Sequence, residues 1–147
     1  MLIDQVTNAG ALPALELVLR FAGQRQRLLA HNVANLSTPD FRPQDASVAG
    51  FQSMLRDAID ARRNKSGGMH GELDWRPTRE FEAGPRGDLT LVPRTPVGGV
   101  LGQDRNNRDL ERLMQQVAEN TAAFRVASDL MRQQVSMARS AMAERVG

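Results

Sequence analysis

The C-terminal segment is the feature that most constrains how this chain folds. From Asn106 to Val146 the sequence contains neither glycine nor proline, the two residues that most often interrupt a helix. Apolar side chains recur in it alternately four and three residues apart, as on one stripe of an amphipathic helix. The segment 108–147 therefore predicts one helix of about 37 residues, which is roughly 55 Å long at 1.5 Å per residue. Its stripe consists of Leu110, Met114, Val117, Thr121, Phe124, Ser128, Met131, Val135, Ala138 and Met142.

The N-terminal segment 1–38 predicts a second long amphipathic helix. Its apolar stripe, within 12–36, has the same spacing and one polar interruption, Gln26. The helix is expected to begin near Pro13, because proline suits a first helical turn. It is expected to end before Pro39, because the residue that precedes a proline disfavours helical geometry.

The middle of the chain has a different composition. Segment 39–61 is expected to be a linker with a short amphipathic helix. Segment 62–107 holds eight of the twelve glycines and four of the seven prolines, which predicts an extended loop. The run 88–92 is typical of a short β-strand. The expected fold is mainly α, with the two terminal helices paired in a coiled-coil-like manner and a glycine- and proline-rich middle loop. A four-helix-type domain that folds back on itself is the alternative.

Composition argues against a catalytic role. The chain has no cysteine, which excludes disulfides, a thiol nucleophile and cysteine-based metal sites. His31 and His70 stand apart without the spacing of a zinc site, and no phosphate-binding loop or nucleophile elbow is present. We therefore expect no enzyme activity, no catalytic residues, no cofactor, no metal and no small-molecule substrate.

Charge and surplus apolar surface indicate an interaction protein. The net charge is only +2, and acidic residues interleave with the arginines, as on solvated helix faces or between subunits. We therefore expect no nucleic-acid partner, although a small helical nucleic-acid-binding protein is the alternative from a different class. The C-terminal helix is too long to bury its stripe against the shorter first helix, which favours self-association or assembly with partners.

Two motifs carry a resemblance to a known family. Residues 29–41 read LAHNVANLSTPDF and residues 106–114 read NNRDLERLM. These segments resemble the N- and C-terminal signatures of the bacterial flagellar axial proteins. Two positions depart from that pattern: Asp40 stands where glycine is usual, and Arg108 stands where valine is usual.

The resemblance implies a fold and a function. The short chain is most similar to proximal rod proteins of the FlgB type, with another short proximal rod subunit of the same family as the alternative. Such a protein is a structural subunit of the flagellar basal body. It assembles helically into the periplasm-spanning rod, transmits torque and lines the export channel. Its partners are other copies, other rod proteins, the membrane-ring adaptor and the flagellar type III export apparatus, which exports it without a cleavable signal peptide.

The candidate assembly residues lie on both helices and in the first motif. The amides of Asn32 and Asn35 are expected to cap last-turn carbonyls or to bridge to a neighbouring chain, unless the motif is only a local helix stop. Thr38 and Pro39 are expected to direct the chain outward. The stripes are expected to be buried in an assembly, with Leu110, Val117 and Phe124 facing Leu19 and Leu29. The full set is Leu19, Leu29, Asn32, Val33, Asn35, Thr38, Pro39, Leu110, Met114, Val117, Phe124 and Met131.

A short apolar segment follows the first motif. Phe51, Met54 and Leu55 resemble the stretch by which early flagellar export substrates are recognised at the export gate. We favour the simpler interpretation, in which these residues form one face of a short helix together with Ile59.

Overall fold

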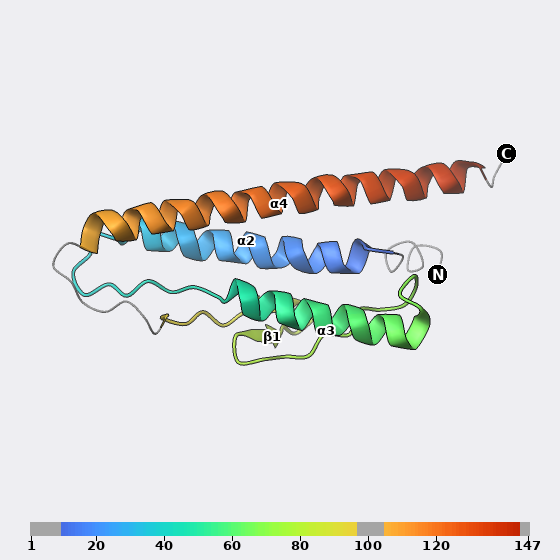
Figure 1. The fold of residues 1–147 in the computed structure, drawn as a ribbon, viewed down its shortest axis with the longest axis horizontal. Coiled ribbons are helices and arrows are strands. Elements are labelled where there is room, and N and C mark those ends of the chain that lie inside the picture. Colours follow the sequence, from blue (N-terminus) through green and yellow to red (C-terminus); the bar gives the residue numbers. More distant parts are fainter. Residues whose placement is uncertain (1–9, 97–104, 145–147) are drawn as a thin grey trace.

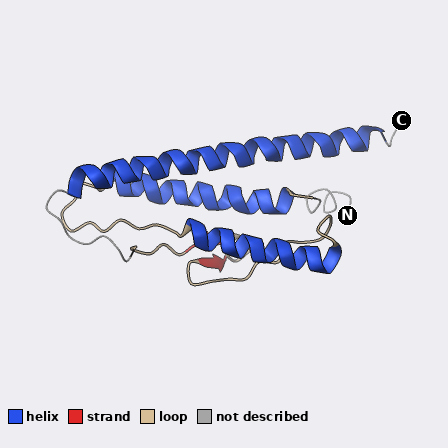
Figure 2. Ribbon diagram, viewed as in Figure 1, coloured by secondary structure: helices blue, strands red, loops and turns tan. Residues whose placement is uncertain are grey.

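The computed structural model describes residues 10–96 and 105–144. These residues form α2 (Leu12–Ala34), α3 (Val48–Ser66), β1 (Phe81–Ala83), β2 (Leu89–Leu91) and α4 (Arg105–Glu144). The fold is mainly helical with one small sheet, as the sequence predicts (Figure 2). Helix α2 lies between α4 on one side and α3 with the strands on the other (Figure 1). The predicted segments 1–38, 62–107 and 108–147 each extend partly beyond the described residues.

Helix α2 begins next to Pro13 and ends before Pro39, as these two prolines predict. Proline occupies the first turn, where its missing N–H leaves no carbonyl unpaired. The helix ends at Ala34, and Asn35 is the C-terminal capping residue. The chain then returns along α2 through an irregular segment that leads to α3.

Helix α3 is longer than the sequence predicts. Ser47 caps its N-terminus, since the hydroxyl accepts a hydrogen bond from the Gly50 N–H at 2.9 Å. The predicted linker ends at residue 61, whereas α3 continues to Ser66. The helix stops where Gly67 adopts a left-handed conformation, with φ 69°, and Arg63 and Lys65 in the last turn favour its continuation that far.

The core lies between α2, α3 and the two strands. Phe21 and Phe51 stack with ring centroids 4.1 Å apart, and the edge of Phe81 meets both rings. Helix α4 contributes no residue to this cluster within the described part of the chain. The buried members are Leu17, Phe21, Ala46, Phe51, Met54, Ala58, Leu73, Phe81, Leu89 and Leu91.

The sheet is an antiparallel hairpin that leans on α2. Strand β2 falls within the predicted run 88–92, and it pairs with β1, which the sequence does not predict. The side chain of Gln24 covers the free edge of β2. Its amide donates to the Leu89 carbonyl at 2.6 Å and accepts from the Leu91 N–H at 3.0 Å. One glutamine therefore makes the two bonds that a third strand otherwise makes.

A buried ion pair fixes the chain that returns from α2. The guanidinium of Arg25 donates to both carboxylate oxygens of Asp45, at 2.9 and 2.7 Å. The backbone of Asp45 in turn pairs with that of Arg94 through two hydrogen bonds of 3.0 Å. Helix α2 thus anchors the segment around Asp45 directly, and through it the segment around Arg94.

Candidate assembly surface on the C-terminal helix

Helix α4 meets α2 through a narrow face. Its three buried residues, Leu113, Asn120 and Ala127, are spaced seven apart along the helix. The amide of Asn120 donates to the Ala22 carbonyl at 2.9 Å and to Gln26 Oε1 at 2.8 Å. These bonds place the predicted stripe of α2 against α4, since residues three and four apart share a helix face.

The predicted stripe of α4 is not the face that packs on α2. Leu110, Met114 and Phe124 are exposed, and Val117 and Met131 are half-buried. Leu110 and Phe124 are therefore not buried against α2 within one chain, and their burial in an assembly stays a prediction. On α2, Leu29 is fully buried, and Leu19 and Val33 are half-buried.

Exposed apolar side chains form two strips along α4. Strip 1 is part of the stripe predicted from the sequence, and strip 2 lies outside that stripe and was not predicted. At about 100° per residue, the two strips lie roughly 180° apart around the helix, each about 90° from the face on α2. Strip 1 consists of Leu110, Met114, Phe124 and Met142, and strip 2 consists of Val126, Leu130 and Met137.

The fourth side of α4, opposite α2, is polar or small and fully exposed. Two of its eight residues are charged, and the other six are Ala, Gln and Ser. Helix α4 therefore has four different sides. Within the described residues, the side that packs on α2 holds its buried residues, and the side of strip 1 is only partly covered. The residues of the polar side are Glu111, Gln115, Ala118, Ala122, Asp129, Gln133, Ser136 and Ser140.

Asn32 of the first motif has an internal role. It is buried, its amide donates to the Gln44 carbonyl at 2.7 Å, and its Oδ1 accepts from the Gln44 N–H at 3.1 Å. The expectation that Asn32 caps the helix or reaches a neighbouring chain is wrong, because both halves of its amide hold the returning segment. Any effect of Asn32 on assembly is therefore indirect.

Asn35 behaves as a capping residue, as expected. Its side-chain amide donates to the His31 carbonyl at 2.8 Å. Thr38 and Pro39 are exposed just beyond it. Asp40 has φ 58°, a left-handed conformation that glycine favours and that aspartate tolerates better than most residues. Asp40 therefore has a backbone conformation that a glycine at this position would also adopt.

The segment that resembles an export signal lies in the fold's core. Phe51 and Met54 are buried and Leu55 is half-buried. This placement agrees with the helix-face interpretation. The side chains of Phe51 and Met54 are therefore accessible to another protein only when the chain unfolds.

The described residues hold no group of three or more histidine, aspartate or glutamate side chains arranged for a metal ion. His31 lies against the Phe41 ring, with centroids 5.5 Å apart, and the Asn35 amide lies 3.3 Å from its Nδ1. These contacts give His31 a packing role at the end of α2.

Comparisons with known proteins add no family assignment. No protein-family model matches the chain, and no curated protein matches it. Among the described helices, none combines the length and the apolar character that a membrane span requires.

Proposed function

We propose that this chain is a structural, non-catalytic subunit of the proximal rod of the bacterial flagellar basal body, of the FlgB type. The observation that carries the proposal is the pair of uncovered apolar strips on opposite sides of α4. The two sequence motifs at 29–41 and 106–114 supply the resemblance to the flagellar axial proteins.

The strips favour an assembly of many copies. Phe124 is 42% exposed, and Val126 and Met137 are 59% and 57% exposed, which is costly for apolar side chains in water. A single neighbour covers only one strip, because the strips lie on opposite sides of the helix. When one copy binds its neighbours through two different surfaces, each contact is head-to-tail. If such contacts do not close into a ring, they repeat from copy to copy and build a helical filament.

The interior of such an assembly follows from the same helix. In the proposal α2 and α4 pair in a coiled-coil-like manner, and the part-buried Asn120–Gln26 contact sets their register, as a polar pair at a core position does in coiled coils. The polar side of α4 then lines the channel. A surface made mostly of alanine, serine and glutamine, with Glu111 and Asp129, suits a water-filled lumen through which unfolded chains pass.

Single aspartate substitutions on each strip test this function. Phe124→Asp and Leu130→Asp lie at exposed positions, so each variant is expected to keep the fold, with a circular dichroism spectrum like that of the wild type. Each is expected to prevent rod formation, because a charge at the centre of an apolar contact opposes its burial. Ser136→Asp on the polar side is the matched control and is expected to support rods.

The readout is electron microscopy of isolated basal bodies, together with swimming. Rods without defect in both strip variants contradict the proposal. Loss of rods in Ser136→Asp as well as in the strip variants removes the strips as the explanation.

A further inference from the structure

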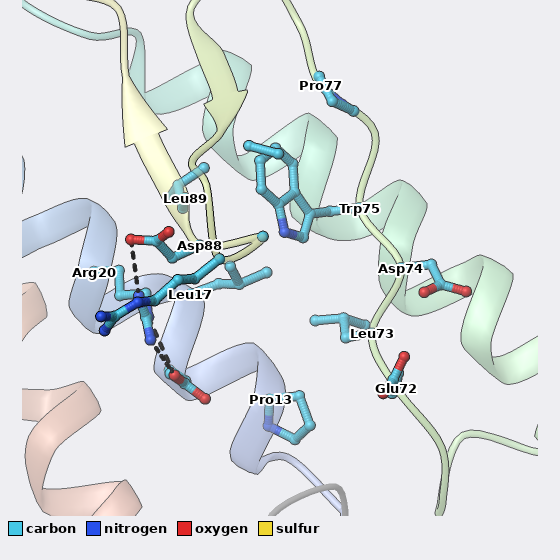
Figure 3. A pocket seen from close by; sticks show the side chains of 14 residues that line it. Pro13, Leu17, Arg20, Glu72, Leu73, Asp74, Trp75, Pro77, Asp88 and Leu89 are labelled. Atoms are coloured by element: carbon cyan, nitrogen blue, oxygen red, sulfur yellow. Dashed lines mark hydrogen bonds and ion pairs between the residues drawn. The ribbon is translucent and has the colours of Figure 1, made fainter.

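A groove opens between the first half of α2, the turn of the hairpin and the extended segment 72–78, here called the strap. Its volume is about 640 Å³, which is within the range of small-molecule sites in proteins. The buried side chains of Leu17, Leu73 and Leu89 form its floor (Figure 3). A small ligand therefore finds an apolar base in this groove.

The strap presents an aromatic ring to the groove. Side chains alternate along an extended chain, so Leu73 and Trp75 point to the groove, and Asp74 between them points the other way, toward Lys65 of α3 at 3.5 Å (Figure 3). The Trp75 ring is half-buried, and its Nε1 has no hydrogen-bond partner within residues 10–96 and 105–144. This N–H is open to solvent, because no buried side-chain nitrogen or oxygen of the described residues lacks a partner.

Helix α2 and the hairpin supply the opposite wall. Glu16, Leu17 and Arg20 share one face of α2, since they are three or four residues apart. The Arg20 guanidinium donates to Glu16 Oε1 at 2.8 and 3.1 Å, and its Nη1 lies 3.5 Å from Asp88 Oδ2. Glu16, Arg20 and Asp88 form a row across the groove from Trp75, here called the charged row (Figure 3). Their side chains are 39–54% exposed, so a ligand can reach their polar atoms.

The turn of the hairpin holds Asp88 at the groove. The Gly84 N–H donates to the Asp88 carbonyl at 2.7 Å, and the Gly87 N–H donates to the Gly84 carbonyl at 2.8 Å. A Cβ on Gly84 would lie 2.6 Å from Asp88 Oδ1, so only glycine leaves the room that this carboxylate occupies. The charged row is therefore in place before a ligand arrives, which lowers the cost of binding.

The lining favours an uncharged ligand. The charges that α2 and the hairpin bring to the groove, on Glu16, Arg20, Arg86 and Asp88, cancel, so neither an anion nor a cation meets an excess of opposite charge. A wholly apolar ligand would take water from the charged row without replacing its hydrogen bonds, which is costly. Proline-rich peptides dock in grooves lined by aromatic rings, whereas Trp75 is the one aromatic residue among the described residues that line this groove.

A carbohydrate has the properties that remain. A pyranose ring is neutral, and the C–H groups on its face are attracted to the negative face of an aromatic ring. Its hydroxyl groups donate to carboxylates and accept from guanidinium groups. We propose that the groove binds a neutral oligosaccharide, with one pyranose ring stacked on Trp75 and its hydroxyl groups hydrogen-bonded to the charged row. The site is separate from the strips of α4 and does not depend on the proposed rod function.

The fluorescence of the full chain tests the site, because Trp75 is its only tryptophan. The chain is titrated with chitotriose, cellotriose and maltotriose, three neutral oligosaccharides that differ in linkage and substitution. We expect a saturable change in emission with at least one of them, with a Kd of about 1 mM or below. No saturable change with any of the three up to about 10 mM overturns the proposal.

Variants of the charged row locate the binding. Arg20→Gln and Asp88→Asn keep Trp75, and each is expected to weaken the binding about fivefold or more, as the loss of a hydrogen bond does. The matched control is Arg63→Gln, which removes an exposed guanidinium that also lies near a carboxylate, Asp60 at 3.4 Å, outside the groove. Its affinity is expected to equal that of the wild type, and its circular dichroism spectrum and those of the other variants are expected to be unchanged. Equal affinities of Arg20→Gln and Arg63→Gln overturn the proposal.

Saturation-transfer NMR follows the sugar itself and so does not need the tryptophan. Trp75→Leu is expected to lose the sugar signal, and Trp75→Phe is expected to keep part of it, because a smaller ring still stacks. A full signal in Trp75→Leu overturns the proposal. Emission that changes with protein concentration and with none of the sugars identifies a second copy as the occupant, which also overturns it. These measurements use the purified chain, so their failure leaves the rod function standing.

Discussion

The side-chain amide of Asn120 on α4 donates to Gln26 Oε1 on α2 at 2.8 Å, across a sequence separation of 94 residues. Gln26 is the one polar interruption in the apolar stripe of α2. The same Asn120 amide also donates to the Ala22 carbonyl. The interruption is therefore one half of a part-buried polar pair that links α2 to α4.

Asn120→Ala is expected to lower the free energy of unfolding by about 1–3 kcal/mol, because it removes both hydrogen bonds of a buried side chain and leaves the Ala22 carbonyl without its donor. Urea denaturation followed by circular dichroism measures this change. Gln115→Ala removes an exposed hydrogen bond on the same helix and is expected to stay within about 0.5 kcal/mol of the wild type. Equal effects of the two substitutions contradict the role of Asn120.

Asp45→Asn is expected to destabilise the chain by about 3 kcal/mol, because it leaves the buried Arg25 guanidinium without a counter-charge. The side chain of Arg25 is only 6% exposed. The matched control is Asp129→Asn, whose partner Arg132 is exposed, and its expected effect is about 0–1 kcal/mol. Chemical denaturation of both variants gives the comparison, and a small effect of Asp45→Asn refutes the anchoring role.

Gln24→Ala is expected to loosen the hairpin, because it uncovers the Leu89 carbonyl and the Leu91 N–H at the edge of β2. We expect faster hydrogen exchange at the Leu91 amide and a loss of about 1–3 kcal/mol in the free energy of unfolding. Gln52→Ala, at an exposed position on α3, serves as the control. Unchanged exchange at Leu91 in Gln24→Ala indicates that the strand pair needs no support from α2.

The stacked rings of Phe21 and Phe51 allow the export segment to be tested apart from stability. Phe51→Ala and Phe21→Ala each remove one ring of the same pair, so both are expected to cost about 3–5 kcal/mol of stability. Only Phe51 belongs to the segment that resembles an export signal. If that segment is a signal, secretion falls in Phe51→Ala/Leu55→Ala and not in Phe21→Ala. Equal secretion of the two leaves it a structural helix face.

Much of the helical framework could be predicted from the sequence. The prolines and the spacing of apolar residues locate α2, and the absence of glycine and proline locates α4. The end of α3 was misplaced because nothing before Gly67 stops a helix. Strand β1 was missed because three residues, Phe81–Ala83, are too few for their alternation to stand out, and they pair only because β2 returns beside them.

The packing of α4 could not be predicted from periodicity. The helix has apolar residues on three sides, with Ala127 on the packed face, Phe124 on strip 1 and Leu130 on strip 2. A periodic pattern identifies apolar sides without saying which side is covered within the chain. Asn120 decides this, and an asparagine in a sequence gives no sign of the distant carbonyl that it will meet.

The polar side chains of α2 show the same limit. Gln24 and Asn32 each bind a donor and an acceptor of one distant backbone segment, on β2 and at Gln44. Such bonds depend on the three-dimensional path of the chain. In the sequence, Gln24 resembles an ordinary polar position of a helix. Asn32 belongs to the motif 29–41, from which a contact with a neighbouring chain was expected.

The most direct test of the rod function is electron cryo-microscopy of basal bodies isolated from cells that lack this chain. We predict membrane rings without a rod, together with loss of swimming, and recovery of both when the wild-type chain is supplied again. Complete rods in the cells that lack it would contradict the account.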